Sequence, residues 1–340
     1  MQNTSEADTS NKYRFYMPCA KDASRLARFF TMRPCRACES GWLDYFIWAE
    51  YYRVRYTVMD DRALLIVMKS GDEYFAALPY CTEADLPHYF DVLRGFFNDV
   101  LEQPFKIYLA DEEGVNALKL TENADYVVRE EPDFRDYLYD ADAMRTLAGR
   151  KLQKKRNLIN HFLQEFEGRW EYRALVCEDR DTVVRFLDEW FPNEKTVDEE
   201  AEETLRFERE GLMSVLTDCA EMDYRAGGIF IDGELKAFTL GTYNAREEMA
   251  VVSVEKADPD IPGLYQLINR EFITHAFPEA KLVNREDDMG LPGLRHAKES
   301  YKPVAYEKKY MVVQKCFRGR RVDTTDPYEE SVAGRESEEL

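Results

Sequence analysis

The sequence predicts an α/β (α+β) protein of two consecutive units, each with a mixed sheet flanked by helices. Three observations lead to this prediction. The chain has 340 residues, which suits two domains of about 150 residues each better than a single domain. Apolar residues make up 45% of the sequence and aromatic residues 13%, enough for two packed cores. Segments with helix and strand periodicity also follow one another in a similar order in both halves.

The first half begins with a helix and continues with short strands. β-Branched and aromatic residues between turn signals predict the strands, and apolar residues three and four positions apart predict the helices. The expected order is a helix at 22–30, strands at 51–59, 63–68 and 74–78, a helix at 84–101, a strand at 105–109, a helix at 112–120 and a strand at 126–130.

The second half repeats this order with more helices. The same signals predict a helix at 147–166, a strand at 171–176, helices at 179–191 and 199–216, a hairpin of strands at 228–231 and 235–241, a strand at 248–256, a helix at 264–276, a strand at 281–284, a helix at 291–301 and a strand at 304–313. This is the element order of a GNAT-type acyl-CoA N-acyltransferase fold, which the first half follows more loosely. We therefore expect a tandem GNAT-like fold.

The predicted domain limits follow from this pattern. We expect a disordered N-terminus at 1–12, GNAT-like domains at 13–142 and 143–316, and a disordered acidic tail at 317–340, where the sequence is polar, charged and aperiodic. No stretch of 18 apolar residues is present and the first ten residues lack an apolar signal region, so the expected location is cytoplasmic.

The charge and the cysteines limit the possible functions. The formal net charge is -20, which disfavours general binding to nucleic acid and argues against a DNA-binding protein, although a local basic site stays possible. The seven cysteines are scattered, so no disulfide framework is expected. Cys35 and Cys38 form a lone CxxC without the partners that zinc requires. No metal site is therefore expected.

A basic segment opens the second half. Between residues 143 and 164 there are six basic residues and no acidic one. On a helix, Arg150, Lys154, Asn157 and His161 share one face, and Lys155 belongs to the same basic run. Such a stripe could bind the phosphate of a nucleotide, a lipid head group or a tRNA backbone. The alternative is a solvated face that pairs with the acidic helix at 199–210.

A second charged segment follows the strand at 248–256. Glu255, Lys256 and Asp258 lie at its end, and a Pro/Gly loop precedes the next helix, which contains Tyr265. The N-terminus of a helix attracts anions, and CoA-binding acetyltransferases hold pyrophosphate at the equivalent loop. The glycine-rich fingerprint of those enzymes is absent here, and the nearby carboxylates would repel phosphate. The alternative is a structural ion-pair network.

A third segment places charged residues after the strand at 281–284. Ligands of open α/β sheets bind at the carboxyl ends of strands, so this loop and the following helix are candidates for a polar pocket. The candidate residues are Arg285, Glu286, Asp287, Arg295, Lys298 and Tyr301. In the alternative reading the loop is solvated, and Asp287 or Asp288 only caps the helix. The four His residues form no catalytic or zinc-binding set.

Several runs of the second half together resemble an uncharacterised bacterial family related to the C-terminal domain of phosphatidylglycerol lysyltransferase. The runs are Gly149-Arg-Lys-Leu-Gln-Lys-Lys-Arg-Asn157, Val254-Glu-Lys-Ala-Asp258, Gly263-x-Tyr265, Ile268-Asn-x-Glu-Phe272, Asn284-Arg-Glu-Asp-Asp-Met-Gly290, Gly293-Leu-Arg295, Ala297-Lys298 and Ser300-Tyr301-x-Pro303. They are spread over residues 149–310 and are specific in combination rather than singly.

The resemblance implies a tandem GNAT-like fold that is similar also to the Fem-type aminoacyltransferases. Those relatives move an aminoacyl group from tRNA to an amine or hydroxyl acceptor, so the expected function is acyl or aminoacyl transfer. Fold does not fix function, and two alternatives stay open: a CoA-dependent N-acyltransferase, and a non-catalytic binding protein with the same fold. The donor is then aminoacyl-tRNA or acyl-CoA, and no other cofactor is expected.

This hypothesis gives the candidate residues their roles. Arg150, Lys154 and Lys155 hold a phosphate of the donor. Glu255 or Asp287 accepts the proton of the acceptor. Arg285, Arg295 and Lys298 bind a carboxylate or phosphate and the developing oxyanion. The remaining candidates for substrate binding are Asn157, Lys256, Asp258, Tyr265, Glu286 and Tyr301.

Overall fold

The computed structural model describes residues 13–193 and 199–324. The predicted disordered N-terminus and most of the predicted acidic tail lie outside these ranges. Among the helices of the described ranges, none has the length and apolar character needed to cross a membrane.

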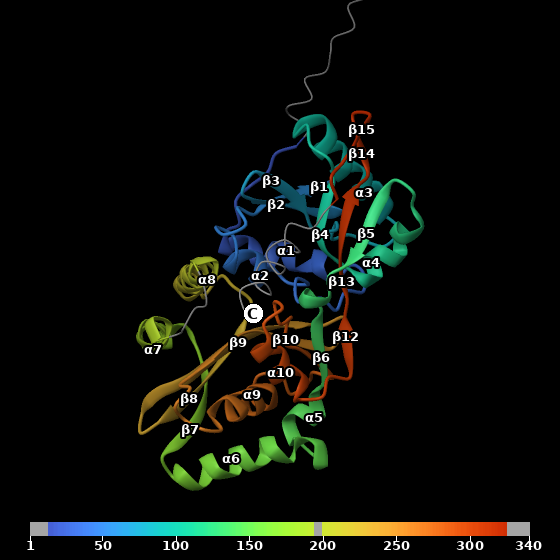
Figure 1. Ribbon diagram of the computed structural model, residues 1–340. Helices are drawn as coiled ribbons and strands as arrows, with labels where there is room; N and C mark the ends of the chain where they lie inside the picture. Colours follow the sequence, from blue (N-terminus) through green and yellow to red (C-terminus); the bar gives the residue numbers. More distant parts are fainter. Residues whose placement is uncertain (1–12, 194–198, 325–340) are drawn as a thin grey trace, which may run out of the picture.

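Two large mixed sheets organise the chain and lie one above the other in Figure 1. The first sheet has the order β1 (Arg55–Met59), β2 (Ala63–Ser70), β3 (Glu73–Ala76), β4 (Lys106–Asp111), β13 (Lys309–Gln314) and β5 (Tyr126–Glu130). The second has the order β12 (Ala305–Glu307), β6 (Asp136–Asp140), β11 (Leu282–Asn284), β10 (Met249–Ala257), β9 (Glu234–Asn244), β8 (Arg225–Ile231) and β7 (Trp170–Leu175). The predicted class, two mixed sheets flanked by helices, is confirmed.

Helices cover both faces of each sheet. They are α1 (Ala23–Phe30), α2 (Trp42–Ile47), α3 (Leu86–Gly95), α4 (Glu112–Ala117), α5 (Ala141–Thr146), α6 (Gln153–Glu165), α7 (Arg180–Trp190), α8 (Glu199–Thr217), α9 (Leu264–His275) and α10 (Pro292–Glu299). Short helical turns lie at Ala20–Asp22, Leu120–Glu122, Pro132–Phe134, Arg150–Leu152, Cys177–Asp179 and Phe191–Asn193, and α3 continues as a π-helical turn at Phe96–Val100.

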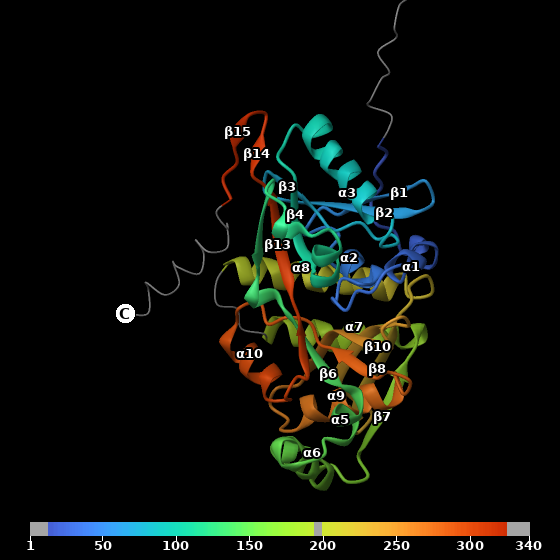
Figure 2. The same cartoon turned by 90° about the vertical axis from the view of Figure 1, so that its right-hand side faces the viewer.

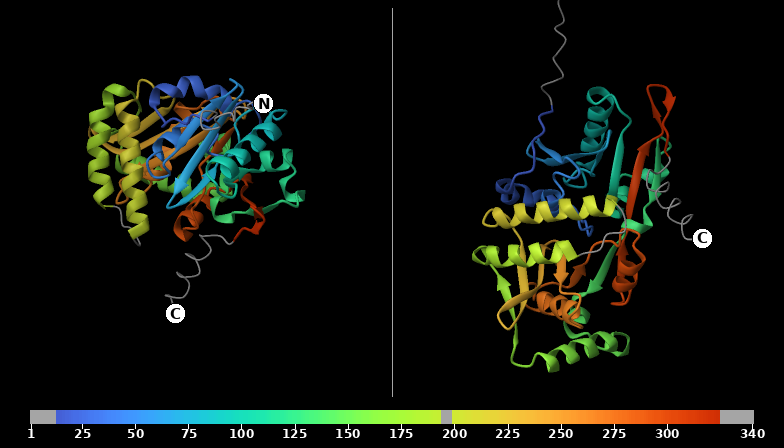
Figure 3. Two further views of the ribbon diagram at one scale, coloured as in Figure 1. Left: turned by 90° about the horizontal axis from the view of Figure 1, so that it is seen from above. Right: turned by 60° about the vertical axis from the view of Figure 1, so that its left-hand side comes forward.

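One hydrophobic core joins the two sheets. Side chains from α1, α2, α7 and α8 pack together with residues of β2, β8 and β9, and Figure 3 shows α8 lying between the first sheet and α7. The fit is close at Gly211 of α8, where an added Cβ would lie 2.1 Å from the carbonyl oxygen of Ile47 in α2. Separate cores lie on the outer faces, under α3 in the first sheet and under α5, α6 and α9 in the second.

Local sequence explains most of these elements. The β8–β9 hairpin turns at Asp232 and Gly233, which both have positive φ values, 53° and 84°, as a two-residue turn of this kind requires. On α6, Ile159 and Phe162 are fully buried, as expected for the apolar side of an amphipathic helix. Pro292 begins α10, where its fixed φ suits the first turn.

The two sheets exchange strands at the same level of the molecule. The strand predicted at 304–313 is in fact two strands, because β12 pairs with β6 in the second sheet and β13 pairs with β4 and β5 in the first. Only Lys308 separates them, and the crossing is visible in Figure 2. The opposite crossing runs from β5 to β6, a strand that the sequence did not predict. The predicted boundary between two domains, at residues 142 and 143, stays a prediction.

Neighbouring strands of the second sheet diverge where the predicted third segment begins. The parallel pairing of β10 with β11 covers only Met249–Val251 against Leu282–Asn284, whereas β10 continues to Ala257. A bulge at Ser253 also shifts the register between β10 and β9. The carboxyl end of β11 therefore faces an opening in the sheet, a place where α/β proteins bind ligands.

Two further expectations are corrected. Cys177 and Cys219 form a disulfide, although the scattered cysteines predicted none; Cys35 and Cys38 are both buried thiols. The predicted tail at 317–340 does not begin at its expected position, because β14 (Cys316–Phe317) and β15 (Arg320–Arg321) form a small two-stranded ribbon. Polar, aperiodic sequence gives little local signal for so short a hairpin.

Candidate functional site

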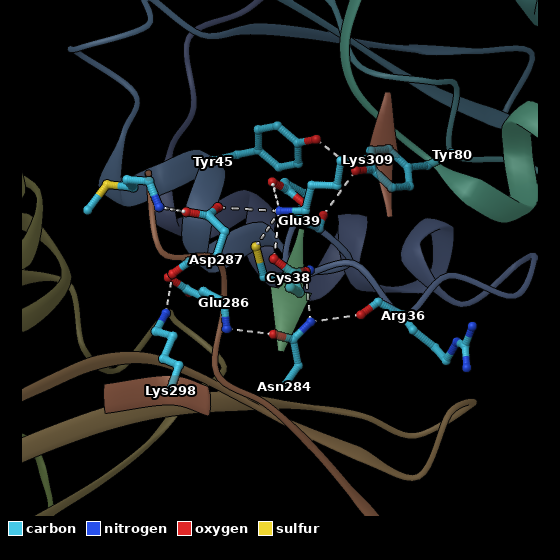
Figure 4. Close-up of polar contacts among 12 residues, drawn as sticks. Arg36, Cys38, Glu39, Tyr45, Tyr80, Asn284, Glu286, Asp287, Lys298 and Lys309 are labelled. Atoms are coloured by element: carbon cyan, nitrogen blue, oxygen red, sulfur yellow. Dashed lines mark hydrogen bonds and ion pairs between the residues drawn. The ribbon is translucent and has the colours of Figure 1, made fainter. Parts of the chain in front are cut away.

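A buried cluster of charged side chains lies where the chain crosses between the sheets (Figure 4). At its centre is Lys309, the first residue of β13, with a fully buried side chain. Its ammonium nitrogen lies 2.7 Å from Glu39 Oε1, 2.8 Å from Asp136 Oδ1 and 3.7 Å from Asp287 Oδ2. Burial lowers the pKa of Lys309, but Asp136 and the other nearby acidic groups outweigh it and hold the pKa well above its usual value.

The loop that contains the CxxC pair forms one wall of this cluster. The backbone N–H of Cys38 donates to Asp136 Oδ2 at 2.6 Å, and Cys38 Sγ accepts from Lys309 Nζ at 3.2 Å. Asn284, the last residue of β11, donates to Asp136 Oδ2 and to the carbonyl oxygen of Arg36, both at 2.8 Å. The loop is thereby tied to the ends of two strands of the second sheet.

Two further carboxyl groups extend the cluster toward β10. Asp44 comes from α2, and Glu286 comes from the loop after β11. Burial, and then the charge of Glu39, raise the pKa of Asp44 to about 8, while a hydrogen bond to Ser253 opposes the rise. Burial, and then the charge of Asp44, raise the pKa of Glu286 well above its usual value. These two groups therefore hold protons at a pH where ordinary carboxyl groups are ionised.

Lys298 closes the cluster from α10. Its side chain is buried, and Nζ donates to the carbonyl oxygens of Arg285, at 2.6 Å, and Asp287. Burial lowers its pKa. Because the ammonium is bound to two backbone carbonyls, it fixes the loop after β11 rather than neutralising one carboxylate.

Acidic groups outnumber basic groups in this cluster. The five carboxyl groups are those of Glu39, Asp44, Asp136, Glu286 and Asp287, and the two ammonium groups are those of Lys298 and Lys309. Burial, the largest influence, also raises the pKa of Asp287. An excess of buried carboxyl groups can accept protons near neutral pH or hold a cation. We define these seven residues as the acidic centre.

Cys38 and carboxyl groups of the acidic centre offer ligand atoms that are close enough together for a metal ion. Cys38, Glu39 and Asp136 each offer one within 4.8 Å of the others. However, the Lys309 ammonium contacts all three side chains. At this group the lysine cation takes the place that a metal would need. A second group, Cys38, Asp44 and Glu286, also offers ligand atoms within 4.8 Å of one another.

A second group of predicted residues gathers beside the sheet opening. Arg285 NH2 donates to Glu255 Oε1 at 3.0 Å, and Asn269 of α9 donates to Glu255 Oε2 at 2.8 Å. The buried ring of Tyr301 lies beneath two cations, Arg285 and Lys155. The structure thus brings four predicted residues, Glu255, Arg285, Tyr301 and Lys155, into one place.

The rest of the predicted basic face is exposed on the outer side of the second sheet. Arg150, Lys154 and Asn157 are all exposed. The alternative reading, pairing with the acidic helix, does not hold in the described residues, because α8 packs on α2 and α7 and lies far from α6 in Figures 1 and 3. The basic side of α6 therefore faces solvent.

Arg295 is bound by two carboxylates. Its guanidinium donates to Asp288 at 2.8 and 2.9 Å and to Asp133 at 2.6 Å. Tyr137 also donates to Asp288, and Asp133, Tyr137 and Arg295 line part of a cavity of about 180 Å³. The proposed contact of Arg295 with an oxyanion stays a prediction, since the substrate would have to compete with both carboxylates.

The remaining predicted residues point in different directions. Lys256 pairs with Glu208 of α8 at 2.8 Å. Asp258 accepts from the backbone N–H of Asp260. Tyr265 is half-buried against the outer core. Glu255 and Lys256 thus each form an ion pair, with Arg285 and with Glu208, but not with one another.

The N-termini of two helices bear on the expectations for the second and third segments. The start of α9 is tightly packed, because a Cβ on Gly263 would lie 2.4 Å from the carbonyl oxygen of Leu158 in α6. Neither Asp287 nor Asp288 caps α10, whose N-cap is Leu291 without a side-chain cap. The two aspartates accept instead from the backbone N–H groups of Met289 and Gly290 within the loop.

Sequence reasoning missed more than half of the acidic centre. Glu39, Asp44, Asp136 and Lys309 were not among the predicted residues. Asp44 lies on a six-residue helix that is apolar on nearly all sides, so no periodicity reveals it. A lysine at the start of an otherwise apolar strand was the one available signal for Lys309.

A protein-family model described as "Phosphatidylglycerol lysyltransferase, C-terminal" matches residues 36–313 of the chain. A solved protein of unknown function from Bacteroides thetaiotaomicron is 27% identical, with a TM-score of 0.79 over 88% of this chain and 99% of that one. L-PGS from Bacillus licheniformis is 16% identical, with a TM-score of 0.65 over 93% of this chain and 96% of that one.

FemX shares the fold at greater distance. It is 8% identical, with a TM-score of 0.56 over 87% of this chain and 97% of that one. Together these likenesses confirm the resemblance and the tandem GNAT-like fold that the sequence predicted.

Proposed function

The chain belongs to the family of the C-terminal domain of phosphatidylglycerol lysyltransferase, and from that premise we propose that it is an aminoacyltransferase. It moves an aminoacyl group, carried as an ester by tRNA, to the amine or hydroxyl group of an acceptor.

The observation that carries this proposal is the acidic centre at the carboxyl end of β11. An aminoacyl group bears an α-ammonium, and a lysyl group bears a second one. Buried carboxyl groups in excess over buried ammonium groups are suited to such a cation, because its charge would stabilise their ionised form and replace the protons that they otherwise hold. Asp44 and Glu286 have no lysine at ion-pair distance among the described residues, and they are the pair that we assign to the ammonium.

The chemical step breaks one ester bond and forms one amide or ester bond. The acceptor nitrogen or oxygen attacks the carbonyl carbon of the aminoacyl ester, and the terminal ribose oxygen of the tRNA leaves. The acceptor loses one proton, and the departing oxygen gains one. A carboxylate that accepts the first proton and returns it to the leaving oxygen completes the step.

Asp287 is our candidate for this carboxylate. Burial raises its pKa, which makes its carboxylate more basic than an ordinary aspartate. It lies on the loop that follows β11, between the ammonium groups of Lys309 and Lys298. Glu255, the other predicted base, is bound by both Arg285 and Asn269 and is less available.

The direct test measures transfer from a total pool of tRNA charged with radiolabelled amino acids, with phosphatidylglycerol vesicles and free amino acids present as hydroxyl and amine acceptors. We expect the full chain to release the label from tRNA faster than buffer does, with one class of amino acid preferred. Asp287→Asn should abolish the acceleration, whereas Lys21→Gln, an exposed change in the first half, should leave it intact. If no charged tRNA loses its label faster with the chain than without it, the proposal is wrong; release from acyl-CoA instead would indicate a CoA-dependent N-acyltransferase.

A further inference from the structure

Two cations contact one buried tyrosine ring beside the sheet opening. Tyr301 is 6% exposed. Lys155 Nζ of α6 lies 4.4 Å from its ring centroid, and the guanidinium carbon of Arg285 lies 5.0 Å from the same centroid. Each contact is favourable by itself. Together they place two like charges close to one ring, which costs free energy unless something compensates.

The compensation inside the protein is incomplete. Arg285 has a carboxylate partner in Glu255. Lys155 has none within ion-pair distance in the part of the chain that the structure describes. Burial, and then the charges of Arg285, Lys154 and Lys302, lower the pKa of Lys155 to about 8. Four cationic groups thus act on one another, and among the described residues only Arg285 has a carboxylate at ion-pair distance, in a chain whose formal net charge is -20.

A purely structural role does not account for this arrangement. A neutral side chain at position 155 would cover Tyr301 without repulsion from Arg285. The cluster also involves separate segments: Lys154 and Lys155 lie on α6, Arg285 directly follows β11, and Lys302 follows α10. Unpaired positive charge gathered from three segments is suited to an anion with several oxygen atoms.

We propose that Lys154, Lys155, Arg285 and Lys302 form a phosphate-binding subsite that holds a phosphate ester of the substrate over the ring of Tyr301. The ligand is a phosphate monoester or diester, and we favour the sugar–phosphate end of a nucleotide chain. Arg285 joins the subsite to the acidic centre, because its carbonyl oxygen accepts from Lys298. The favoured source rests on the proposed aminoacyl transfer, whereas the phosphate subsite itself does not.

The subsite differs from the position that the sequence suggested. There the anion was expected at the N-terminus of α9, as in CoA-binding acetyltransferases, or along the exposed stripe of α6. The N-terminus of α9 packs closely against Leu158. Lys155 is half-buried and lies between the exposed stripe and the sheet opening. A phosphate bound by Lys155 would therefore lie deeper in the protein than a phosphate bound by the stripe alone.

Calorimetric titration of the full chain tests the subsite with three probes, namely inorganic phosphate, AMP and glycerol 3-phosphate. We expect saturable binding of at least one. Tighter binding of AMP identifies a nucleotide source, and tighter binding of glycerol 3-phosphate identifies a lipid head group. If none of the three binds saturably at low salt, the subsite is wrong.

Variants locate the binding. Lys155→Gln and the exposed Lys302→Gln should each weaken binding about tenfold or more, because each removes a charge-assisted contact. Lys151→Gln is the matched control: it makes the same change on the turn that leads into α6, and it should alter affinity less than about twofold. Equal affinities for Lys155→Gln, Lys302→Gln and the unchanged chain would overturn the assignment, even if phosphate binds elsewhere.

Proton uptake gives an independent readout. A phosphate would favour the charged form of Lys155 and raise its pKa, so binding at about pH 8.5 should take up protons. Arg285, Lys154, Lys302, Tyr301 and Glu255 are the titratable and charged groups that face the Lys155 amine, whose own pKa is lowered to about 8. Titrations in two buffers of different ionisation enthalpy measure the uptake, and the uptake should disappear in Lys155→Gln. Uptake that persists in this variant would contradict the proposal.

The two proposals fail separately. Phosphate binding that depends on Lys155, without aminoacyl transfer, would leave the subsite standing and remove the proposed function. If the chain transfers aminoacyl groups but the Lys155→Gln and Lys302→Gln variants bind phosphate as well as the unchanged chain does, the proposed function stands and the phosphate subsite is wrong.

Discussion

Lys309 and Asp136 form a fully buried ion pair, with Nζ and Oδ1 2.8 Å apart, at the level where the chain crosses between the two sheets. Asp136 begins β6, on the way into the second sheet, and Lys309 begins β13, on the way back into the first. The pair therefore joins the two halves where they exchange strands. It also sets the charge of the acidic centre, because Lys309 is the cation nearest to Glu39 and Asp136.

The first prediction concerns this pair. Lys309→Met leaves Asp136 and Glu39 without their cation in a water-poor environment, and we expect it to lower the free energy of unfolding by about 3–5 kcal/mol. Urea denaturation measures the change. The adjacent Lys308→Met is the control: Lys308 is 43% exposed and lies 3.6 Å or more from its partners, so about 0–1 kcal/mol is expected. If both variants lose the same free energy of unfolding, the buried ion pair contributes no more to stability than the exposed Lys308 does.

A second prediction follows from the raised pKa of Asp44. The folded state binds a proton at Asp44 up to about pH 8, whereas the unfolded chain releases it near the ordinary aspartate pKa of about 4. In this window the folded state holds more protons, so the contribution of Asp44 to stability falls as the pH rises from about 4 to 8.

Asp44→Asn removes this dependence and should lose less stability than the unchanged chain between pH 5 and pH 8. Unfolding by urea at the two pH values measures the difference. Asp72→Asn, a change at a fully exposed aspartate in the turn between β2 and β3, serves as the control and should follow the unchanged chain. Parallel behaviour of Asp44→Asn and the unchanged chain would mean that Asp44 is ionised in the folded state.

The disulfide gives a third prediction. Cys177 and Cys219 are 42 positions apart and enclose α7 and α8. A bond that closes a loop of this length stabilises the folded state by about 4 kcal/mol in the chain-entropy model. A reducing agent should therefore lower the melting temperature of the unchanged chain but not that of Cys177→Ser. If the reducing agent does not change the melting temperature of the unchanged chain, the two cysteines are not joined by a disulfide in solution.

The sequence predicted elements that local signals define and missed those that depend on distant partners. The β8–β9 hairpin, α6 and α9 follow from turn residues and periodicity, and all three were predicted. β6 was not, because its Tyr137–Tyr139 segment lies in a short strand without flanking signals, and its partners β11 and β12 come much later in the chain. The prediction of a single strand at 304–313 was wrong for the same reason, because the partners of β12 and β13 lie far away in the sequence.

The candidate site shows the same division. Glu286, Asp287 and Lys298 were predicted because charges accumulate where a strand ends, a position with a known role in α/β sheets. Their partners Asp44 and Glu39 come from the first half, and no local pattern indicates that these residues meet the loop after β11. These residues become candidates for the functional site because they are buried and because they contact residues of the other half. A sequence shows neither property.

Arg295 allows a fourth prediction that separates two roles. If it only holds the loop after β11, Arg295→Ala leaves the buried carboxylate of Asp288 unpaired, since that side chain is 2% exposed. The expected cost is on the order of 3 kcal/mol of unfolding free energy. Asp133→Asn, which removes the more exposed partner, should cost less. If Arg295 instead contacts the oxyanion, transfer should fall about a hundredfold or more with little change in stability, and a purely structural role would be wrong.

The last prediction concerns the proton acceptor. Asp287→Asn keeps the shape of the side chain and its acceptor for the Met289 N–H but removes its basicity, so kcat for aminoacyl transfer should fall about 100- to 10,000-fold. Because burial raises the pKa of Asp287, the rate of the unchanged chain should rise with pH through a pKa above the ordinary aspartate value. That limb should vanish in the variant.

Glu255→Gln is the matched comparison, since the same change at the other predicted base leaves Asp287 intact. We expect it to weaken the hold on Arg285 and to raise KM more than it lowers kcat. If Glu255→Gln abolishes the pH-dependent limb and Asp287→Asn preserves it, the roles of the two carboxylates are exchanged. The acceptor's proton would then be removed at the sheet opening, next to the proposed phosphate subsite, rather than in the acidic centre.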